Sequence, residues 1–145
     1  MICLLCHILA FKYSKAMKFL KLIPISIIIL LFIFSSCKKA GTGGAFTIAA
    51  FPKHHSVPIK GAIIYIKYNA KDFPGEDVSV YDDSGVVDTM PGEDPHFHFD
   101  GLKRGNYYLY SVGYDSTISQ VVKGGIPVEI NEKEGEVDVV VPVTE

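Results

Sequence analysis

From Gly44 onward the sequence consists of short segments in which apolar and polar residues alternate, with turn residues between them. Alternation at period two, in runs of roughly four to eight residues bounded by Gly, Pro, Asn and Asp, indicates β-strands. No run of helical period exceeds a turn or two in this part of the chain. The pattern predicts an all-β fold, a single antiparallel β-sandwich of seven or eight strands over residues 45–145.

The expected strands follow directly from this alternation. They cover residues 44–51, 61–69, 78–81, a short stretch at 86–88, and then 96–102, 105–115, 118–130 and 136–143. Residues 71–77 contain Pro74-Gly75 and are predicted to form a loop, and residues 82–85 (DDSG) are predicted to form a turn. Pro127 lacks a backbone donor, so we expect an edge strand or a bulge there.

An apolar run at residues 22–34 divides the chain into two parts. It has thirteen positions, interrupted only by Pro24 and Ser26. A membrane-spanning helix needs roughly 18 or more apolar residues, whereas the apolar region of a secretory signal peptide has roughly 7–15. Lys18 and Lys21 stand in front of the run and supply the positive charge that a signal peptide carries there. The run therefore predicts a signal peptide.

The run ends in Ser35-Ser36-Cys37, which resembles the lipobox of bacterial lipoproteins, with Phe34 where Leu is common. That resemblance implies that Cys37 receives a diacylglyceryl thioether and that residues 1–36 are removed. The alternative is a signal-anchor helix followed by an incidental cysteine. Residues 1–16 precede a complete signal peptide, so either translation begins at Met17 or the signal peptide has a long front region.

Residues 37–44 would then form the lipidated cysteine and a flexible, Gly-rich tether. Lys38 is not the aspartate that retains many lipoproteins at the inner membrane, so the resemblance favours the outer membrane of a Gram-negative cell envelope. Whether the domain faces the periplasm or the cell surface stays open. The membrane, reached through the lipid, is the first expected partner.

Charge and cysteine content describe the exported part further. The whole chain has a formal net charge of −2, but all sixteen acidic residues and only ten of the basic ones lie from Cys37 onward, which gives −6. Such acidity argues against nucleic acid as a partner, because that affinity comes mostly from Lys and Arg on phosphate. Cys3 and Cys6 lie in the predicted signal region, so no disulfide is expected in the mature domain.

The most specific segment of the chain is HFHFDGLKRGNYYLYSVGY, residues 96–114. It contains the pattern F-x-F-x-x-L-x-x-G-x-Y-x-L, formed by Phe97, Phe99, Leu102, Gly105, Tyr107 and Leu109. This segment resembles the hairpin of carboxypeptidase regulatory-like domains, which are transthyretin-like (prealbumin-like) sandwiches. We expect Phe97, Phe99, Tyr107 and Leu109 to face the core and Leu102 to close one end of the sandwich.

The resemblance implies an accessory module, a spacer, stabiliser or binding unit, and not an enzyme. In agreement with that, the mature part contains no G-x-S-x-G, no phosphate-binding loop, no H-E-x-x-H and no C-x-x-C. No catalytic residues and no cofactor are predicted.

The tyrosines give the main binding hypothesis. Alternation places one set of side chains toward the core (Ile64, Ile66, Tyr68, Tyr107, Leu109) and another set outward (Ile63, Tyr65, Lys67, Tyr108, Tyr110). If the two strands share a sheet, Tyr65, Tyr108 and Tyr110 form an aromatic outer face. Flat rings with a polar tip suit a sugar ring or a protein partner. The alternative is that tyrosine only has a high strand propensity and covers the sheet.

The histidines give a further alternative. His96 and His98 flank Phe97, so their rings should project to one outward face about 7 Å apart along the strand. Together with His54 or His55 they could bind Zn²⁺ or Cu²⁺. Without a third ligand placed by the sequence, they are equally well explained as polar residues on a wet face, and no metal is assigned.

The sequence thus predicts a lipid-anchored, non-catalytic β-sandwich of the cell envelope that serves as an accessory or binding module for a glycan or an envelope protein. A purely structural envelope component is the alternative, and surface metal binding through His96 and His98 is the second alternative.

Overall fold

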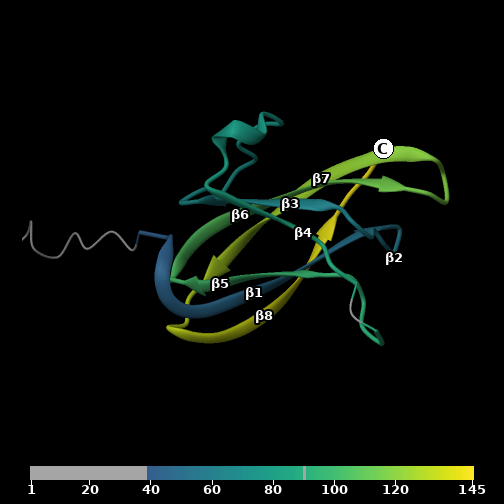
Figure 1. Ribbon diagram of the computed structural model, residues 1–145. Coiled ribbons are helices and arrows are strands. Elements are labelled where there is room, and N and C mark those ends of the chain that lie inside the picture. Colours follow the sequence, from purple (N-terminus) through teal and green to yellow (C-terminus); the bar gives the residue numbers. More distant parts are fainter. Residues whose placement is uncertain (1–38, 90) are drawn as a thin grey trace, which may run out of the picture. The chain divides into compact units, whose positions relative to one another are not determined.

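The computed structural model describes residues 39–89 and 91–145 (Figure 1). The predicted signal peptide, the start at Met17 and the lipidation site Cys37 lie outside the described residues. Within the described residues, no helix has the length and apolar character needed to cross a membrane.

The described chain is almost entirely β. Its elements are β1 (Thr42–His54), β2 (Val57–Pro58), β3 (Ile63–Tyr68), the 3₁₀ turn η1 (Val78–Val80), β4 (Asp83–Val86), β5 (Phe97–Leu102), β6 (Gly105–Asp115), β7 (Gln120–Ile130) and β8 (Glu134–Pro142). These strands form two sheets of four, as expected for a β-sandwich. One sheet has the order β4-β3-β6-β7, and in the other β1 pairs with β2, β5 and β8.

The prediction of a purely antiparallel sandwich is wrong at one pair of strands. β8 runs parallel to β1 over nine residue pairs, from Ala45↔Glu134 to Lys53↔Pro142. A hairpin forces its two strands to be antiparallel. No hairpin imposes that direction on β8, because β7 and β8 lie in different sheets and the chain crosses the sandwich between them.

The motif at residues 96–114 is also arranged differently from a hairpin. β5 belongs to the sheet of β1, whereas β6 belongs to the other sheet, so the turn at Lys103-Arg104 is an arch over the end of the core. The predicted core residues are confirmed: Phe99, Leu102, Tyr107 and Leu109 are buried, and Phe97 packs against them from a partly buried position. Phe99 and Leu109 therefore face the core from opposite sheets.

The core lies between the two sheets and receives buried side chains from β1, β3, β5, β6, β7 and β8. Ile64 and Ile66 of β3 are fully buried, as the alternation of that strand predicts. Burying an aliphatic side chain of this size contributes about 1.5–3 kcal/mol relative to leaving it in water.

Two local predictions between β3 and β5 are wrong. Where a strand is predicted at 78–81, Val78–Val80 form the 3₁₀ turn η1, and Asp77 before it accepts a hydrogen bond from the Ser79 amide at 3.0 Å. The DSG sequence, predicted as a turn, forms β4 at the sheet edge beside β3. Gly85 allows this pairing because the ring of Phe97 occupies the space that a Cβ would need. Of the short strand expected at 86–88, Val86 ends β4 and Asp88 makes an isolated bridge to His96.

The folded domain begins earlier than the predicted tether at residues 37–44 allows. β1 starts at Thr42, and Ala40 is already buried, with its amide donating to Oδ1 of Asn69 at 2.8 Å. The hydroxyl of Tyr107 holds Gly41 at both its amide and its carbonyl. The described chain is therefore held in the fold from Ala40 onward, inside the predicted tether.

Candidate functional site

The outer face of the second sheet brings together the three predicted tyrosines. The register of β3 and β6 places Tyr65 opposite Tyr110, with ring centroids 6.3 Å apart, and Lys67 opposite Tyr108. The sheet order on which the aromatic-face hypothesis depended is therefore present.

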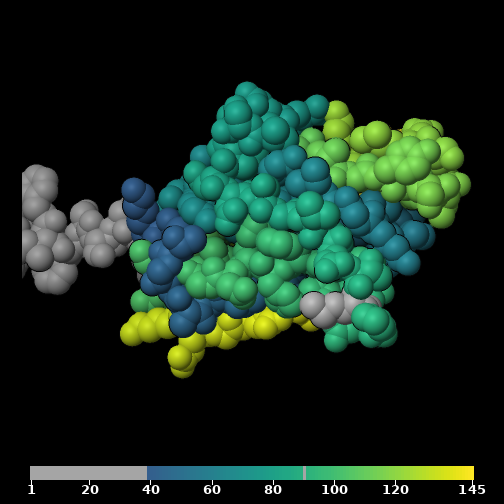
Figure 2. All heavy atoms as spheres, viewed as in Figure 1, coloured from purple at the N-terminus to yellow at the C-terminus, as the bar shows by residue number. Residues whose placement is uncertain are grey.

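The sequence predicts that this face is exposed to solvent, but in the structure it is covered. Residues 69–82, here called the cover segment, fold over it and stand out at the top of the molecule in teal (Figures 1 and 2). Its Phe73 lies 5.7 Å and 5.4 Å from the rings of Tyr108 and Tyr110, and its Tyr81 stacks on Tyr110 at 5.6 Å. Tyr108 and Tyr110 are consequently only 8% and 3% exposed, so the expectation of an exposed tyrosine face is wrong for these two residues.

A hollow of about 290 Å³ remains at the side of the cover segment. Aromatic rings of Phe73, Tyr108 and Tyr110 form part of its wall. Phe73 itself is 48% exposed, so part of its ring faces the solvent. The aromatic face thus survives as a partly closed hollow instead of a flat surface.

The hydroxyl groups of Tyr108 and Tyr110 make no hydrogen bond to any described residue. In contrast, the Tyr81 hydroxyl donates to the Gly75 carbonyl at 2.9 Å and the Tyr107 hydroxyl donates to the Lys103 carbonyl. Among the described residues, Ser111 Oγ is the one buried side-chain polar atom without a partner, so the two tyrosine hydroxyls are not sealed inside. Burial raises the pKa of Tyr108 and Tyr110, which keeps both groups protonated and able to donate.

An ion pair borders the hollow. Lys123 of β7 lies 2.7 Å from the carboxylate of Glu76 in the cover segment, and this hydrogen bond raises the pKa of Lys123. Both side chains are about half exposed, so the pair adds little stability. The Glu76 carboxylate can instead accept hydrogen bonds from a ligand in the hollow, and the Lys123 ammonium group can donate them.

His96, directly before β5, and His98 in β5 lie together but are not both exposed. The rings of His96 and His98 are in edge-to-face contact at 4.7 Å, on one face as predicted. His96 is nearly buried against Phe51, and its Nδ1 lies 2.8 Å from the Asp94 carbonyl. His98 points to Glu136 at 3.4 Å. The structure does not place His54 or His55 with them as the additional ligand.

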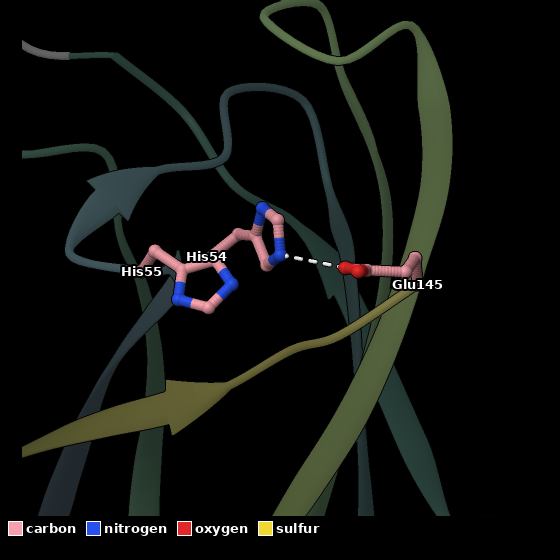
Figure 3. A group of neighbouring side chains, drawn as sticks. All are labelled: His54, His55 and Glu145. Atoms are coloured by element: carbon pink, nitrogen blue, oxygen red, sulfur yellow. Dashed lines mark hydrogen bonds and ion pairs between the residues drawn. The ribbon is translucent and has the colours of Figure 1, made fainter.

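His54 and His55 instead form a second cluster with Glu145, shown in Figure 3. His54 ends β1 and is buried, with Nδ1 2.8 Å from Asp115 Oδ2 and Nε2 2.9 Å from Glu145 Oε2. These carboxylates raise the pKa of His54. Asp115 also accepts hydrogen bonds from the amide and hydroxyl of Thr117, which with His54 lower its pKa to about 2.

Sequence reasoning missed this cluster because its members come from distant parts of the chain. Glu145 is 91 positions from His54, and Asp115 is 61 positions from it. Thr144 exchanges two backbone hydrogen bonds with Lys123 of β7, which fixes the approach of Glu145. The one available signal was the pair His54-His55 at a strand end, which was considered only as a supplement to His96 and His98.

Comparisons with known proteins add no assignment. No family model, no curated protein and no solved structure matches the chain. The resemblance to carboxypeptidase regulatory-like domains therefore stays a prediction.

Proposed function

We propose that the chain is a lipid-anchored, non-catalytic accessory module of the cell envelope that binds a glycan in the hollow beside Tyr108 and Tyr110. The observation that supports this most directly is the pairing of aromatic walls with two tyrosine hydroxyls that have no described partner. Cys37 would carry the lipid, and the outer membrane is the proposed location. The transthyretin-like description of the sandwich belongs to the same proposal.

A glycan fits the chemistry of this hollow. Sugar rings have apolar faces that pack on aromatic rings and hydroxyl groups that need donors and acceptors. Phe73 and the tyrosine rings offer aromatic surfaces for the sugar ring. The tyrosine hydroxyls, Glu76 and Lys123 offer hydrogen-bond donors and acceptors for the sugar hydroxyls. Binding, and not catalysis, is the proposal because the ionised groups at the hollow neutralise each other and both nitrogens of His54 face carboxylates.

The same outer face also continues beyond the hollow as an apolar surface. Ile63, Val86, Tyr114 and Val121 are between 38% and 61% exposed, and the pairs Ile63↔Val86 and Tyr114↔Val121 are direct neighbours. Exposed apolar side chains that cluster in this way are typical of surfaces that contact another molecule. An envelope protein is therefore the alternative partner.

A purely structural role is the alternative function, and the burial of Tyr108 and Tyr110 favours it. Under that alternative the tyrosines only support the cover segment. The test must therefore keep the rings in place and remove the hydroxyls. Replacing these tyrosines by serine would remove buried rings and confuse loss of binding with loss of stability.

The experiment is to screen the full chain against immobilised envelope glycans and to measure the Kd of any ligand by calorimetry. Tyr108→Phe and Tyr110→Phe should each weaken binding about five-fold, the equivalent of one net hydrogen bond of about 1 kcal/mol. Tyr65→Phe, outside the hollow, serves as the control and should leave Kd unchanged. Absence of any glycan ligand, or equal Kd in all four proteins, would leave the structural role as the explanation.

The anchor has a separate test. Protein purified from native membranes should yield an N-terminal peptide that begins at a lipid-modified Cys37 in mass spectrometry. An unmodified N-terminal peptide containing the apolar run of residues 22–34 would contradict lipidation and support a signal-anchor helix.

A further inference from the structure

We propose that His54, His55 and Glu145 bind a divalent transition-metal ion, with Zn²⁺ as the ion that this ligand set fits best. One donor atom from each residue lies within 4.8 Å of the others. Imidazole nitrogen and carboxylate oxygen are ordinary zinc ligands, and three protein ligands with one open position make a four-coordinate site. This site shares no residue with the His96–His98 pair.

The surroundings of His54 are those of a metal-binding imidazole. A metal-bound histidine almost always donates its other ring N–H to a carboxylate, a backbone carbonyl or a water, which fixes the orientation of the ring. Here Asp115 takes that place at Nδ1, at 2.8 Å, so that Nε2 faces Glu145. Asp115 is 2% exposed and is itself held by two hydrogen bonds from Thr117. The ring is thereby aimed before any ion arrives.

His55 is brought beside His54 by a tight turn. His54 pairs with Val57, so His55 and Ser56 form a two-residue hairpin loop, with φ of 45° and 74°. Positive φ at both positions is the geometry of a type I′ turn, in which Asn-Gly is the preferred sequence. His-Ser is an unfavourable choice for such a turn, and unfavourable backbone conformations concentrate at functional sites. The rings of His54 and His55 lie 4.3 Å apart.

Charge balance supports a divalent cation. Asp115 and Glu145 approach the two nitrogens of His54 from opposite sides, at 2.8 Å and 2.9 Å. A divalent ion between Nε2 of His54 and Glu145 would balance the charge of the two carboxylates, and neutral His54 would still donate from Nδ1 to Asp115.

The proposed ligands lie at two neighbouring hollows. His55 lines one of about 480 Å³ with Val140 and Pro142, Glu145 lines the aromatic hollow, and Thr144 lines both. The metal proposal does not depend on the glycan proposal, because its test uses the ion alone.

The test is calorimetric titration of Zn²⁺ into the full chain, stripped with a chelator and carrying no tag after Glu145. We expect one Zn²⁺ per chain. His55→Asn and Glu145→Gln should each weaken the affinity by at least about 10–100-fold, the loss known for removing supporting groups around a metal. His98→Ala is the matched control at the other histidine pair and should bind as the unmodified chain does.

His55→Asn separates metal binding from folding. Asn is a preferred residue at this turn position, so the thermal midpoint of the metal-free variant should be unchanged or higher. Three results would overturn the proposal: no zinc binding by the unmodified chain, equal affinity in His55→Asn, or loss of binding in His98→Ala. The last would place the ion on β5 instead.

Discussion

Removing the Tyr107 hydroxyl is the sharpest test of how the domain holds its first residues. In Tyr107→Phe the ring stays in the core, and only the oxygen is lost. The hydroxyl lies 2.5 Å from the Lys103 carbonyl and 3.2 Å from the Gly41 carbonyl, which share its one hydrogen, and it accepts from the Gly41 amide at 3.1 Å. The Gly41 carbonyl still accepts from the Lys103 amide, so two groups, the Lys103 carbonyl and the Gly41 amide, would lose their hydrogen bonds to this hydroxyl.

At about 1 kcal/mol net for each hydrogen bond, the variant should lose about 2 kcal/mol of unfolding free energy. For a domain of this size the thermal midpoint falls by about 4 °C for each kcal/mol, so we expect a decrease of about 8 °C. The chain has no tryptophan, so the assay is thermal and urea unfolding followed by far-ultraviolet circular dichroism.

Tyr110→Phe is the matched control, because that hydroxyl has no described partner, and its loss should change stability by less than about 0.5 kcal/mol. If Tyr107→Phe costs no more than Tyr110→Phe, the Gly41 contacts do not hold the start of the fold.

Three further predictions concern the core, an edge strand and pH. Ser111→Ala removes the buried hydroxyl without a partner and should raise the unfolding free energy by about 1 kcal/mol in urea titrations. Gly85→Ala places a Cβ 2.1 Å from the Phe97 ring and should lower the unfolding free energy by about 1–3 kcal/mol. An unchanged midpoint would mean that β4 does not pack against Phe97 as described. The third measurement is the thermal midpoint against pH with chelator present. Because the pKa of His54 is raised in the folded protein, its contribution to stability is complete below pH 6.5 and is lost as the pH rises through the folded-state pKa. Because the pKa of Asp115 is lowered to about 2, its contribution is complete above pH 3.8 and is lost as the pH falls toward about 2. The midpoint should therefore be highest between these limits, and His54→Gln should flatten its alkaline side.

The sequence correctly predicts strands and core-facing residues where apolar and polar residues alternate strictly and one face of the strand is buried. β5 and β6 have the predicted bounds within a residue or two, and Ile64, Ile66 and Leu109 face the core as expected. Period-two patterning determines which side chains are buried, because one side of each strand must leave water. It does not determine which sheet a strand joins, so the sequence predicts a hairpin where β5 and β6 belong to different sheets.

The cover segment shows where local signals fail. Val78–Val80 is rich in strand-forming residues, yet it forms a 3₁₀ turn held by Asp77, because the rings of Phe73 and Tyr81 pack on the tyrosines of β6. Strand propensity is weak enough for such packing to override it. Phe73 in the Pro-Gly loop and Tyr81 shortly after it are the available sign that this segment would cover an apolar surface.

The incorrect antiparallel arrangement and the missed histidine cluster have one cause. Because β8 runs parallel to β1, the chain leaves β8 at the same end at which β1 finishes, and Lys53 faces Pro142. The Val143 amide donates to the Lys53 carbonyl, and two residues later Glu145 reaches His54. In an antiparallel pair the end of β8 would lie beside the start of β1, far from His54. A parallel pairing of the first and last strands cannot be inferred from alternation alone, and the proposed metal site depends on that pairing.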